Sequence, residues 1–156
     1  MGETSSRKPA IDITSRVGRP VHELWPIMTS AAGVNAELNP LITMTFPQAG
    51  FDFASAPLNR PLFASWILLF RFLPFDRHTF VLNEIGPSHF VETSHTLLQK
   101  LWRHERYLTE QGNGAEVRDV VTVIPRLRLL SPLTNCVVAA IFRHRHRRLA
   151  RLYPPN

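Results

Sequence analysis

The C-terminal segment Ser131–Tyr153, SPLTNCVVAAIFRHRHRRLARLY, constrains the fold of this chain more than any other part of its sequence. Ser131 followed by Pro132 is typical of a helix start, because serine caps backbone N–H groups and proline at the first helical position loses no hydrogen bond. The residues after them recur at alternating spacings of four and three, which places them on one helical face. They are Val138, Phe142, Arg145, Leu149 and Leu152, with Ile141 beside them. A helix with such a face must pack against another layer of the protein.

Strand patterns dominate the chain before this helix. Ala10–Val17 alternates apolar and polar residues, Leu41–Phe46 is rich in β-formers, and Leu62–Leu73 is a long β-rich run. Between the first two of these segments, Val21–Thr29 and Val34–Leu38 have the spacing of two short helices. We therefore expect an α+β fold, in which a long C-terminal helix lies across a curved antiparallel sheet and two short helices join strands 1 and 2.

One domain is the simplest organisation for 156 residues, since the sequence has no internal repeat and no second hydrophobic core. Residues 1–9 are polar and we expect a disordered tail there, which leaves residues 10–153 as the folded domain. No apolar run approaches the roughly 20 residues that cross a bilayer, and the N-terminus lacks the apolar core of a signal peptide. These features predict a cytoplasmic protein. The single Cys136 cannot form an internal disulfide, and we expect a packed thiol.

The formal charge of +6 is concentrated between Arg143 and Arg151, where seven residues are Arg or His. A uniformly basic nucleic-acid surface is therefore not expected, and cations near a helix C-terminus are favoured by its dipole. Contact with anionic lipid headgroups or with an acidic partner is the functional alternative for this helix end. His144 and His146 do not predict a metal site, because residues two apart point to different sides of a helix.

Two β-patterned runs flank Gln111–Gly114 (QGNG), and this predicts a hairpin because Gly and Asn accept the positive φ of tight turns. If all four residues form the turn, Arg106 lies directly opposite Asp119. If the last two alone form it, Asp119 lies opposite Leu108 and diagonal to Arg106. Both registers keep Arg106 and Asp119 on one face of the sheet.

The face that carries Arg106 and Asp119 is the more apolar one, so we expect it to be concave and inward. Its other residues are Trp102, His104, Leu108, Val117, Val121 and Val123. Because an isolated buried charge is costly, Arg106 and Asp119 should form a pair. The pair either fixes the geometry of the sheet or orients a ligand. His104 is either a core histidine or a general acid or base.

The order of a strand, two short helices, further strands and a long C-terminal helix resembles the START-like helix-grip superfamily. This superfamily is also called SRPBCC and includes polyketide cyclase and dehydratase-like proteins. The residues that carry the resemblance are Trp25, Phe90 and Glu92 in FVE, Trp102 and His104 in WRHER, Asp119 in VRDVV, and Phe142–Arg145. The resemblance implies a cavity between the sheet and the C-terminal helix for apolar or amphipathic molecules. Members range from lipid carriers to cyclases, and the resemblance implies no universal catalytic set.

Our first functional hypothesis is a ligand-binding protein, rather than an enzyme, that holds a hydrophobic or amphipathic molecule such as a lipid or a polyketide. The expected lining is Trp66, Phe70, Trp102, His104, Val121, Ile141 and Phe142, with Arg106, Asp119 and Arg145 as polar contacts. The second is a cyclase or dehydratase-type enzyme, with His104, Arg106 and Asp119 as catalytic candidates. The third is an interaction protein that docks its basic helix end on an acidic partner or membrane surface. No Gly-rich phosphate loop, cysteine pair or Gly-x-Ser-x-Gly elbow occurs, so we expect no cofactor and no metal; the oligomeric state is left open.

Overall fold

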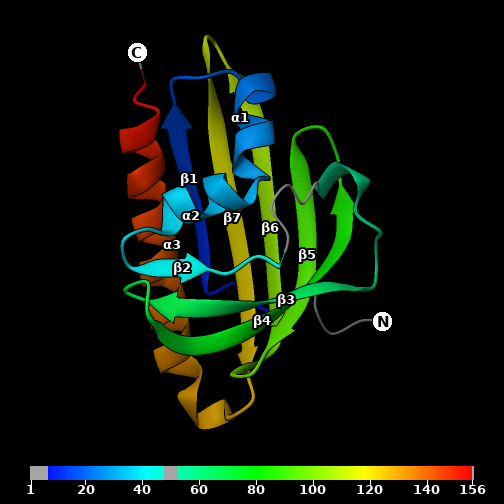
Figure 1. The fold of residues 1–156 in the computed structure, drawn as a ribbon. Helices are drawn as coiled ribbons and strands as arrows, with labels where there is room; N and C mark the ends of the chain where they lie inside the picture. Colours follow the sequence, from blue (N-terminus) through cyan, green and yellow to red (C-terminus); the bar gives the residue numbers. More distant parts are fainter. Residues whose placement is uncertain (1–6, 48–52, 156) are drawn as a thin grey trace.

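The computed structural model describes residues 7–47 and 53–155, so the predicted tail falls largely on residues outside this description. Two helices follow the first strand, and the longest helix comes last (Figure 1). The strands are β1 (Ile11–Val17), β2 (Ile42–Met44), β3 (Pro61–Leu69), β4 (Leu73–Ile85), β5 (His89–Thr96), β6 (Gln99–Gln111) and β7 (Gly114–Pro125). The helices are α1 (Val21–Met28), α2 (Ala31–Leu38) and α3 (Ser131–Leu152), with 3-10 turns at η1 (Phe53–Ser55) and η2 (Arg128–Leu130).

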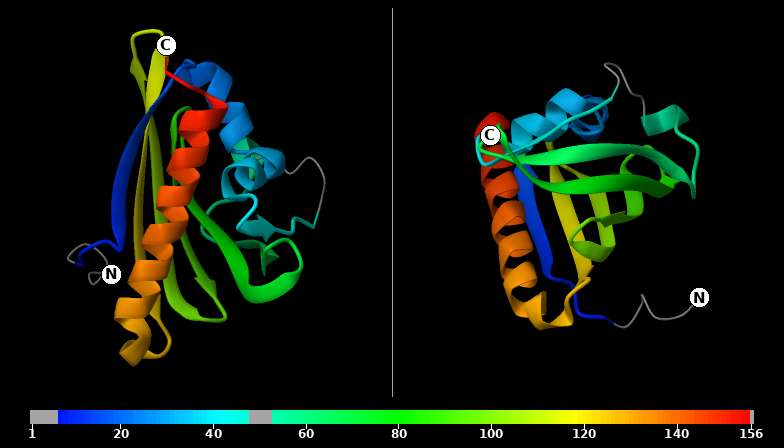
Figure 2. Two further views of the ribbon diagram at one scale, coloured as in Figure 1. Left: turned by 90° about the vertical axis from the view of Figure 1, so that its left-hand side faces the viewer. Right: turned by 60° about the horizontal axis from the view of Figure 1, so that its bottom comes forward.

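The seven described strands form one antiparallel sheet in the order β1-β7-β6-β5-β4-β3-β2. From β2 to β7 each strand pairs with the next one along the chain, and β1 pairs with β7 at the far edge. The sheet curls, so that β3 and β4 cross in front of β6 and β7 while α3 runs along β1 (Figures 1 and 2). The predicted α+β architecture, with a curved sheet, a long C-terminal helix and two short helices between strands 1 and 2, is confirmed.

The buried residues of α3 lie on the face that the sequence predicts. Val138 and Phe142 pack with β1 and β7 in one apolar cluster, and Leu149 packs with α1 and the hairpin end of β6 and β7 in another. Arg145 is also buried, whereas Leu152 at the end of the stripe is exposed. The helix therefore bridges both ends of the sheet.

Two expectations for the start of α3 are wrong. Ser131 is the first helical residue and its side chain caps nothing, because Leu130 takes the N-cap position. Cys136 is exposed, since it points away from the buried face that begins at Val138. Pro132 does occupy the first turn, where its missing N–H costs no hydrogen bond.

The β6–β7 hairpin has the first of the two predicted registers. Gln111 pairs with Gly114, and Arg106 lies directly opposite Asp119. Gly112 in the turn has a φ of +60°, a conformation that glycine adopts without strain. The apolar face of the hairpin is buried as expected, and Val117 on it is fully covered.

The β-rich run Leu62–Leu73 is not one continuous strand, because β3 ends at Leu69 and Leu73 is the first residue of β4. Phe70 and Arg71 have φ values of +50° and +74° and form the turn of a hairpin in which Leu69 pairs with Leu73. The sequence does not predict this turn, because positive φ angles usually occur at Gly or Asn. Leu41–Phe46 likewise contributes only the three residues of β2.

Polar contacts fix α2 against the rest of the domain. Ser30 caps the helix by accepting a hydrogen bond from the Gly33 N–H at 3.0 Å. A Cβ at Gly33 would lie 1.9 Å from the Ile27 carbonyl oxygen, so only glycine fits there. The Asn35 side chain exchanges two hydrogen bonds with the Met44 backbone of β2. These contacts leave Glu37, near the end of α2, buried in the interior.

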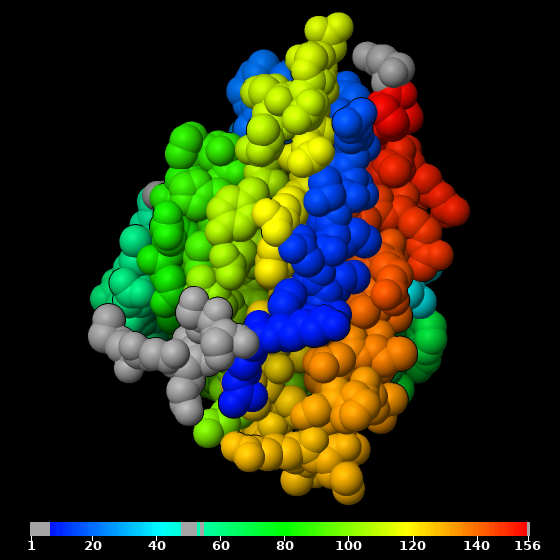
Figure 3. Space-filling model, turned by 180° about the vertical axis from the view of Figure 1, so that it is seen from behind, coloured from blue at the N-terminus to red at the C-terminus, as the bar shows by residue number. Residues whose placement is uncertain are grey.

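The convex face of the sheet is turned to solvent. Seen from behind, β1 and β7 lie side by side, with α3 beyond β1 (Figure 3). Arg118 and Asp12 form an exposed ion pair across these two strands, with the guanidinium donating to both carboxylate oxygens at 2.9 and 2.7 Å.

Candidate functional site

A cavity of about 590 Å³ lies between the concave face of the sheet, the short helices and α3. Apolar side chains from both layers make up most of its lining. They include Met28, Val34, Leu38, Ile42, Met44, Ile67, Phe80, Phe90, Trp102, Val138, Ile141 and Phe142. The cavity exists because the sheet curls away from α3 at β3 and β4, while β1 and β7 stay in contact with the helix.

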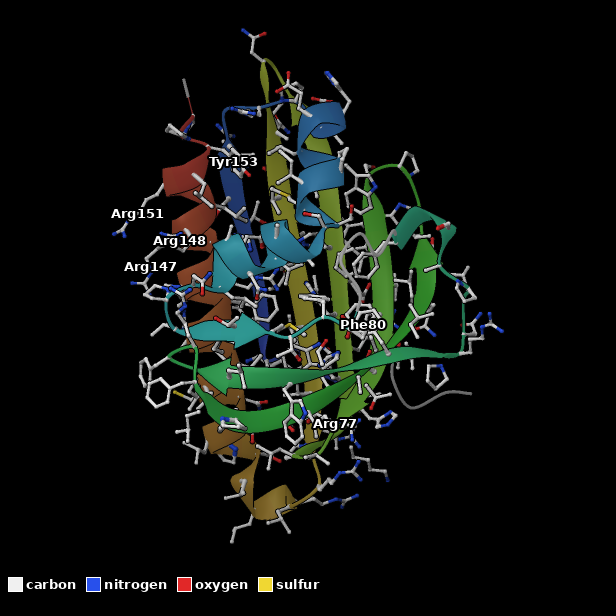
Figure 4. The ribbon with its side chains drawn as sticks, viewed as in Figure 1. Arg77, Phe80, Arg147, Arg148, Arg151 and Tyr153 are labelled. Carbon is white, nitrogen blue, oxygen red and sulfur yellow. The ribbon has the colours of Figure 1, made fainter. Side chains whose placement is uncertain are left out.

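Aromatic rings form one wall of the cavity. Phe142 of α3 lies 6.2 Å from Trp102 and 5.0 Å from His104, both on β6, as measured between ring centroids. Phe90 of β5 meets the same His104 ring edge to face at 5.0 Å. Phe80 lies within the curve of the sheet on β4 (Figure 4). Such edge-to-face packing holds the rings in fixed orientations.

Charged side chains close one end of the cavity. Arg106 donates from Nη1 and Nη2 to the two carboxylate oxygens of Glu37, both at 2.9 Å. It also donates from Nε and Nη2 to Asp119, at 2.8 and 2.7 Å. Four of the five N–H groups of the guanidinium are therefore engaged, and Arg106, Asp119 and Glu37 are almost completely buried.

Two residues of α3 join this network. Arg145 donates to Glu37 Oε2 from Nη2 at 2.7 Å and from Nε at 3.1 Å. His146 places Nε2 3.0 Å from Asp119 Oδ2 and Nδ1 2.8 Å from the Ser15 hydroxyl of β1. The network thus ties α2, β6, β7, β1 and α3 together around the cavity.

A third carboxylate, that of Glu92, and two further imidazoles extend the network along the cavity wall. His104 Nε2 lies 2.8 Å from Asp119 Oδ1, and its Nδ1 lies 3.8 Å from Glu92 Oε2, which is too long for a hydrogen bond. Glu92 also forms a short hydrogen bond with His78 Nε2. Glu92, His78 and His104 are all buried and all line the cavity.

Opposite charges keep these carboxyl groups ionised despite their burial. Burial raises the pKa of Glu37, but the charges of Arg106 and Arg145 outweigh it and hold that pKa below its ordinary value. Burial likewise opposes ionisation of Asp119, yet the charge and hydrogen bonds of Arg106 hold its pKa well below the usual range. For Glu92, the effect of burial is exceeded by His78 and His104, which lower its pKa to about 2. Three carboxylates therefore face two guanidinium groups in the network.

The structure brings six of the ten predicted ligand-binding residues to the cavity wall: Trp102, His104, Arg106, Ile141, Phe142 and Arg145. Asp119 and Val121 are fully buried behind this wall rather than on it. Asp119 still reaches the site through its bonds to Arg106 and His104. Its contacts are those of an internal ion network, one of the two roles that the sequence left open.

Trp66 and Phe70 lie outside the cavity. Trp66 is 44% exposed on the far side of β3, where the Arg77 guanidinium lies 5.7 Å from its ring centroid. Its neighbour Ile67 faces the cavity instead. Phe70 is 60% exposed in the β3–β4 turn. The continuous apolar run around these residues lacks the alternation that would reveal which side chains face inward.

The sequence did not identify Glu37, His78 and His146 as members of this network. Glu37 is separated from Arg106 by 69 residues, and nothing local to α2 marks it as buried. His78 meets Glu92 across a β4–β5 pairing that contains a register shift. The signal for His146 was present, because it lies four residues after Phe142 and therefore on the buried face.

A membrane-spanning helix and a cluster of metal-binding side chains are both absent from the described residues. In residues 7–47 and 53–155, no helix is long and apolar enough to cross a bilayer. In the same part of the chain, no three His, Cys, Asp or Glu side chains are arranged to hold a metal ion.

Comparison with known proteins gives one family and several solved structures. Residues 15–153 match the model of a family described as a domain of unknown function, DUF8410. A search of curated proteins gives no match. Protein CV1439 from Chromobacterium violaceum has a similar structure, with a TM-score of 0.70 at 16% identity over 94% of this chain and 97% of its own.

Two further structures are similar at lower scores. A START superfamily protein from Mycobacterium smegmatis has a TM-score of 0.65 at 10% identity, over 91% of this chain and 97% of its own. The protein Ara h 8.0201 has a TM-score of 0.53 at 10% identity, over 90% of this chain and 97% of its own. At such identities the likeness establishes the fold alone.

Proposed function

This chain belongs to the DUF8410 family and has the START-like helix-grip fold that its sequence resembles, and we propose that it binds a hydrophobic or amphipathic small molecule. The ligand, lipid-like or polyketide-like, occupies the cavity between the sheet and α3. The single observation that carries this proposal is an apolar cavity of about 590 Å³ with one charged end. Ligand sites in proteins commonly measure about 300–1,000 Å³ and combine apolar walls with a few polar groups.

The charged end favours a ligand with hydrogen-bond donors over a carboxylate. Arg106 and Arg145 already donate to Glu37 and Asp119, so neither guanidinium is available as a full counter-ion. A carboxylate ligand would add a fourth negative charge beside the three carboxylates of the network. A hydroxyl or phenol can instead donate to Glu92, whose Oε2 accepts no hydrogen bond within the described residues. Glu92 and His78 therefore become the proposed polar contacts.

Filling the cavity tests the proposal. Ile141→Trp adds a large ring on the cavity side of α3, whereas Ala140→Trp adds the same ring on its exposed side. We expect Ile141→Trp to weaken the binding of the neutral probe N-phenyl-1-naphthylamine by about tenfold or more, because about 1.4 kcal/mol of lost contact already gives that factor. Fluorescence titration measures the affinity, and Ala140→Trp should match the wild type. Equal affinity in both variants would place the probe elsewhere and defeat the proposal.

Acid–base chemistry on the bound molecule is a second candidate function, favoured by the position of Glu92 between His78 and His104 on the cavity wall. The masses recovered from wild type and His104→Gln would separate the two functions. Glutamine can still donate to Asp119, so the variant should bind. A binding protein releases the same compound in both cases, whereas an enzyme releases product from the wild type and substrate from the variant.

A further inference from the structure

Seven large apolar residues both line the cavity and are exposed to solvent, and we call them the mouth rim. They are Phe75, Leu97, Leu98, Leu127, Leu130, Leu133 and Val137. Leu129, beside them in η2, is 92% exposed and does not line the cavity. A soluble monomer rarely leaves so many large apolar side chains together in water, and such patches mark sites of docking.

Backbone contacts hold the segments of the mouth rim in one arrangement. The β5–β6 turn is joined to β4 by hydrogen bonds from the Leu97 N–H to the Arg77 carbonyl and from the Leu98 N–H to Asp76 Oδ1, both at 3.2 Å. Arg126, which precedes η2, donates its backbone N–H to the Leu98 carbonyl at 3.0 Å. The β5–β6 turn, η2 and the start of α3 lie together at the end of the domain away from the C-terminus (Figures 1 and 2).

The charges around the mouth rim are of one sign. Arg77, Lys100, Arg126 and Arg128 are exposed beside it. Asp76 is the only acidic residue within 73–77, 95–100 and 125–137, and its side chain is buried. Exposed leucines surrounded by arginine and lysine fit the interface of an anionic bilayer, where the apolar side chains enter the acyl boundary and the cations meet lipid phosphates.

The basic end of α3 lacks this combination. Arg147 and Arg151 are exposed there and point away from the sheet (Figure 4). Leu152 is the one exposed large apolar residue in the last two turns of the helix, and this end lies opposite the mouth rim. Charge without apolar surface gives a weaker and more salt-sensitive attraction to membranes.

We propose that the mouth rim docks on an anionic lipid bilayer. The same leucines then lie in the bilayer on one side and line the cavity on the other, so an apolar molecule can pass between them without crossing water. The passage of ligand rests on the proposed function, whereas the docking itself does not.

Vesicle flotation with the full chain tests the docking. The wild type should float with vesicles of phosphatidylcholine mixed with phosphatidylserine and much less with phosphatidylcholine alone. Leu129→Glu should abolish flotation, because it places a carboxylate at the most exposed point of this surface without touching the cavity. Leu58→Glu, at an exposed leucine in the η1–β3 loop, is the matched control and should float like the wild type.

Charge removal distinguishes the two basic surfaces. Arg128→Ser should weaken vesicle binding roughly fivefold, the factor expected for one cation near an anionic membrane, whereas Arg147→Ser should leave it unchanged. A wild type that does not float, a Leu129→Glu variant that floats normally, or a loss confined to Arg147→Ser would overturn the proposal. Leu129→Glu should also keep its affinity for N-phenyl-1-naphthylamine, so a failure of docking and a failure of ligand binding are separable.

Discussion

Replacing Asp119 by alanine should lower the free energy of unfolding by about 3–5 kcal/mol, as is typical when one partner of a buried ion pair is removed. Asp119 is fully buried and accepts two hydrogen bonds from Arg106, and it also pairs with His104 and His146. Without it, the Arg106 charge stays buried with Glu37 as its remaining counter-ion, and Glu37 is shared with Arg145. Urea unfolding followed by circular dichroism measures the loss.

Asp12→Ala is the matched control for this variant. Asp12 forms the same bidentate pair with Arg118, the residue next to Asp119, but on the solvent face of the sheet. Exposed pairs contribute about 0–1 kcal/mol, so the control should unfold close to the wild type. If Asp119→Ala loses as little stability as an exposed pair contributes, about 0–1 kcal/mol, the Asp119 network is solvated and the interior described above is wrong.

Acid should unfold this protein through the same network. The pKa values of Glu37, Glu92 and Asp119 are lower in the folded protein than in the unfolded chain, so the unfolded chain binds more protons as the pH falls. Their contribution to stability is complete above about pH 4.5 and is lost as the pH falls towards 2. Glu92 alone, with a pKa lowered from 4.5 to about 2, should account for about 3 kcal/mol.

Urea denaturation at a series of pH values between 7 and 2 measures this loss, and we expect the stability to fall more steeply with pH below about pH 4.5. Glu92→Gln should be less stable at neutral pH and should show a shallower decline in acid. Glu84→Gln, at an exposed carboxylate of β4, should keep the wild-type slope. A stability that stays constant down to pH 2 would show that these carboxyl groups titrate normally.

The buried network also explains how an apolar cavity can persist in this fold. Glu37 comes from α2, Arg106 from β6, Asp119 from β7 and Arg145 from α3, so the charges cross-link every layer that surrounds the charged end. An apolar cavity of this size would otherwise tend to collapse, because its lining lacks packing partners on one side. Directional ion pairs resist that collapse because breaking one leaves an uncompensated buried charge.

Local patterns were sufficient for the central hairpin and for α3. The QGNG turn and the alternation around it placed Arg106 and Asp119 on one face and left two registers, of which the structure has the one that sets them directly opposite. The spacing of Val138 and Phe142 predicted the buried helical face. These features depend on periodicities that a chain shows within a few residues.

Other parts of the site depend on contacts that no local pattern specifies. Glu37 is buried only because α2 folds back over Arg106. An unbroken apolar run does not show which side of the sheet the Trp66 side chain faces. The turn at Phe70 and Arg71 lacks the Gly or Asn residues that usually indicate a tight turn. The cavity itself follows from the curl of the sheet, which results from strand twist and register shifts summed over several strands.

Native mass spectrometry of the protein purified without detergent tests whether a ligand binds between the sheet and α3, when wild type, Ala140→Trp and Ile141→Trp are compared after incubation with a lipid extract. We expect a one-to-one complex with a small apolar molecule for wild type and Ala140→Trp, which solvent extraction would then identify, and little or none for Ile141→Trp. A wild type that takes up no molecule, or an Ile141→Trp variant that carries as much as the wild type, would contradict a ligand site between the sheet and α3.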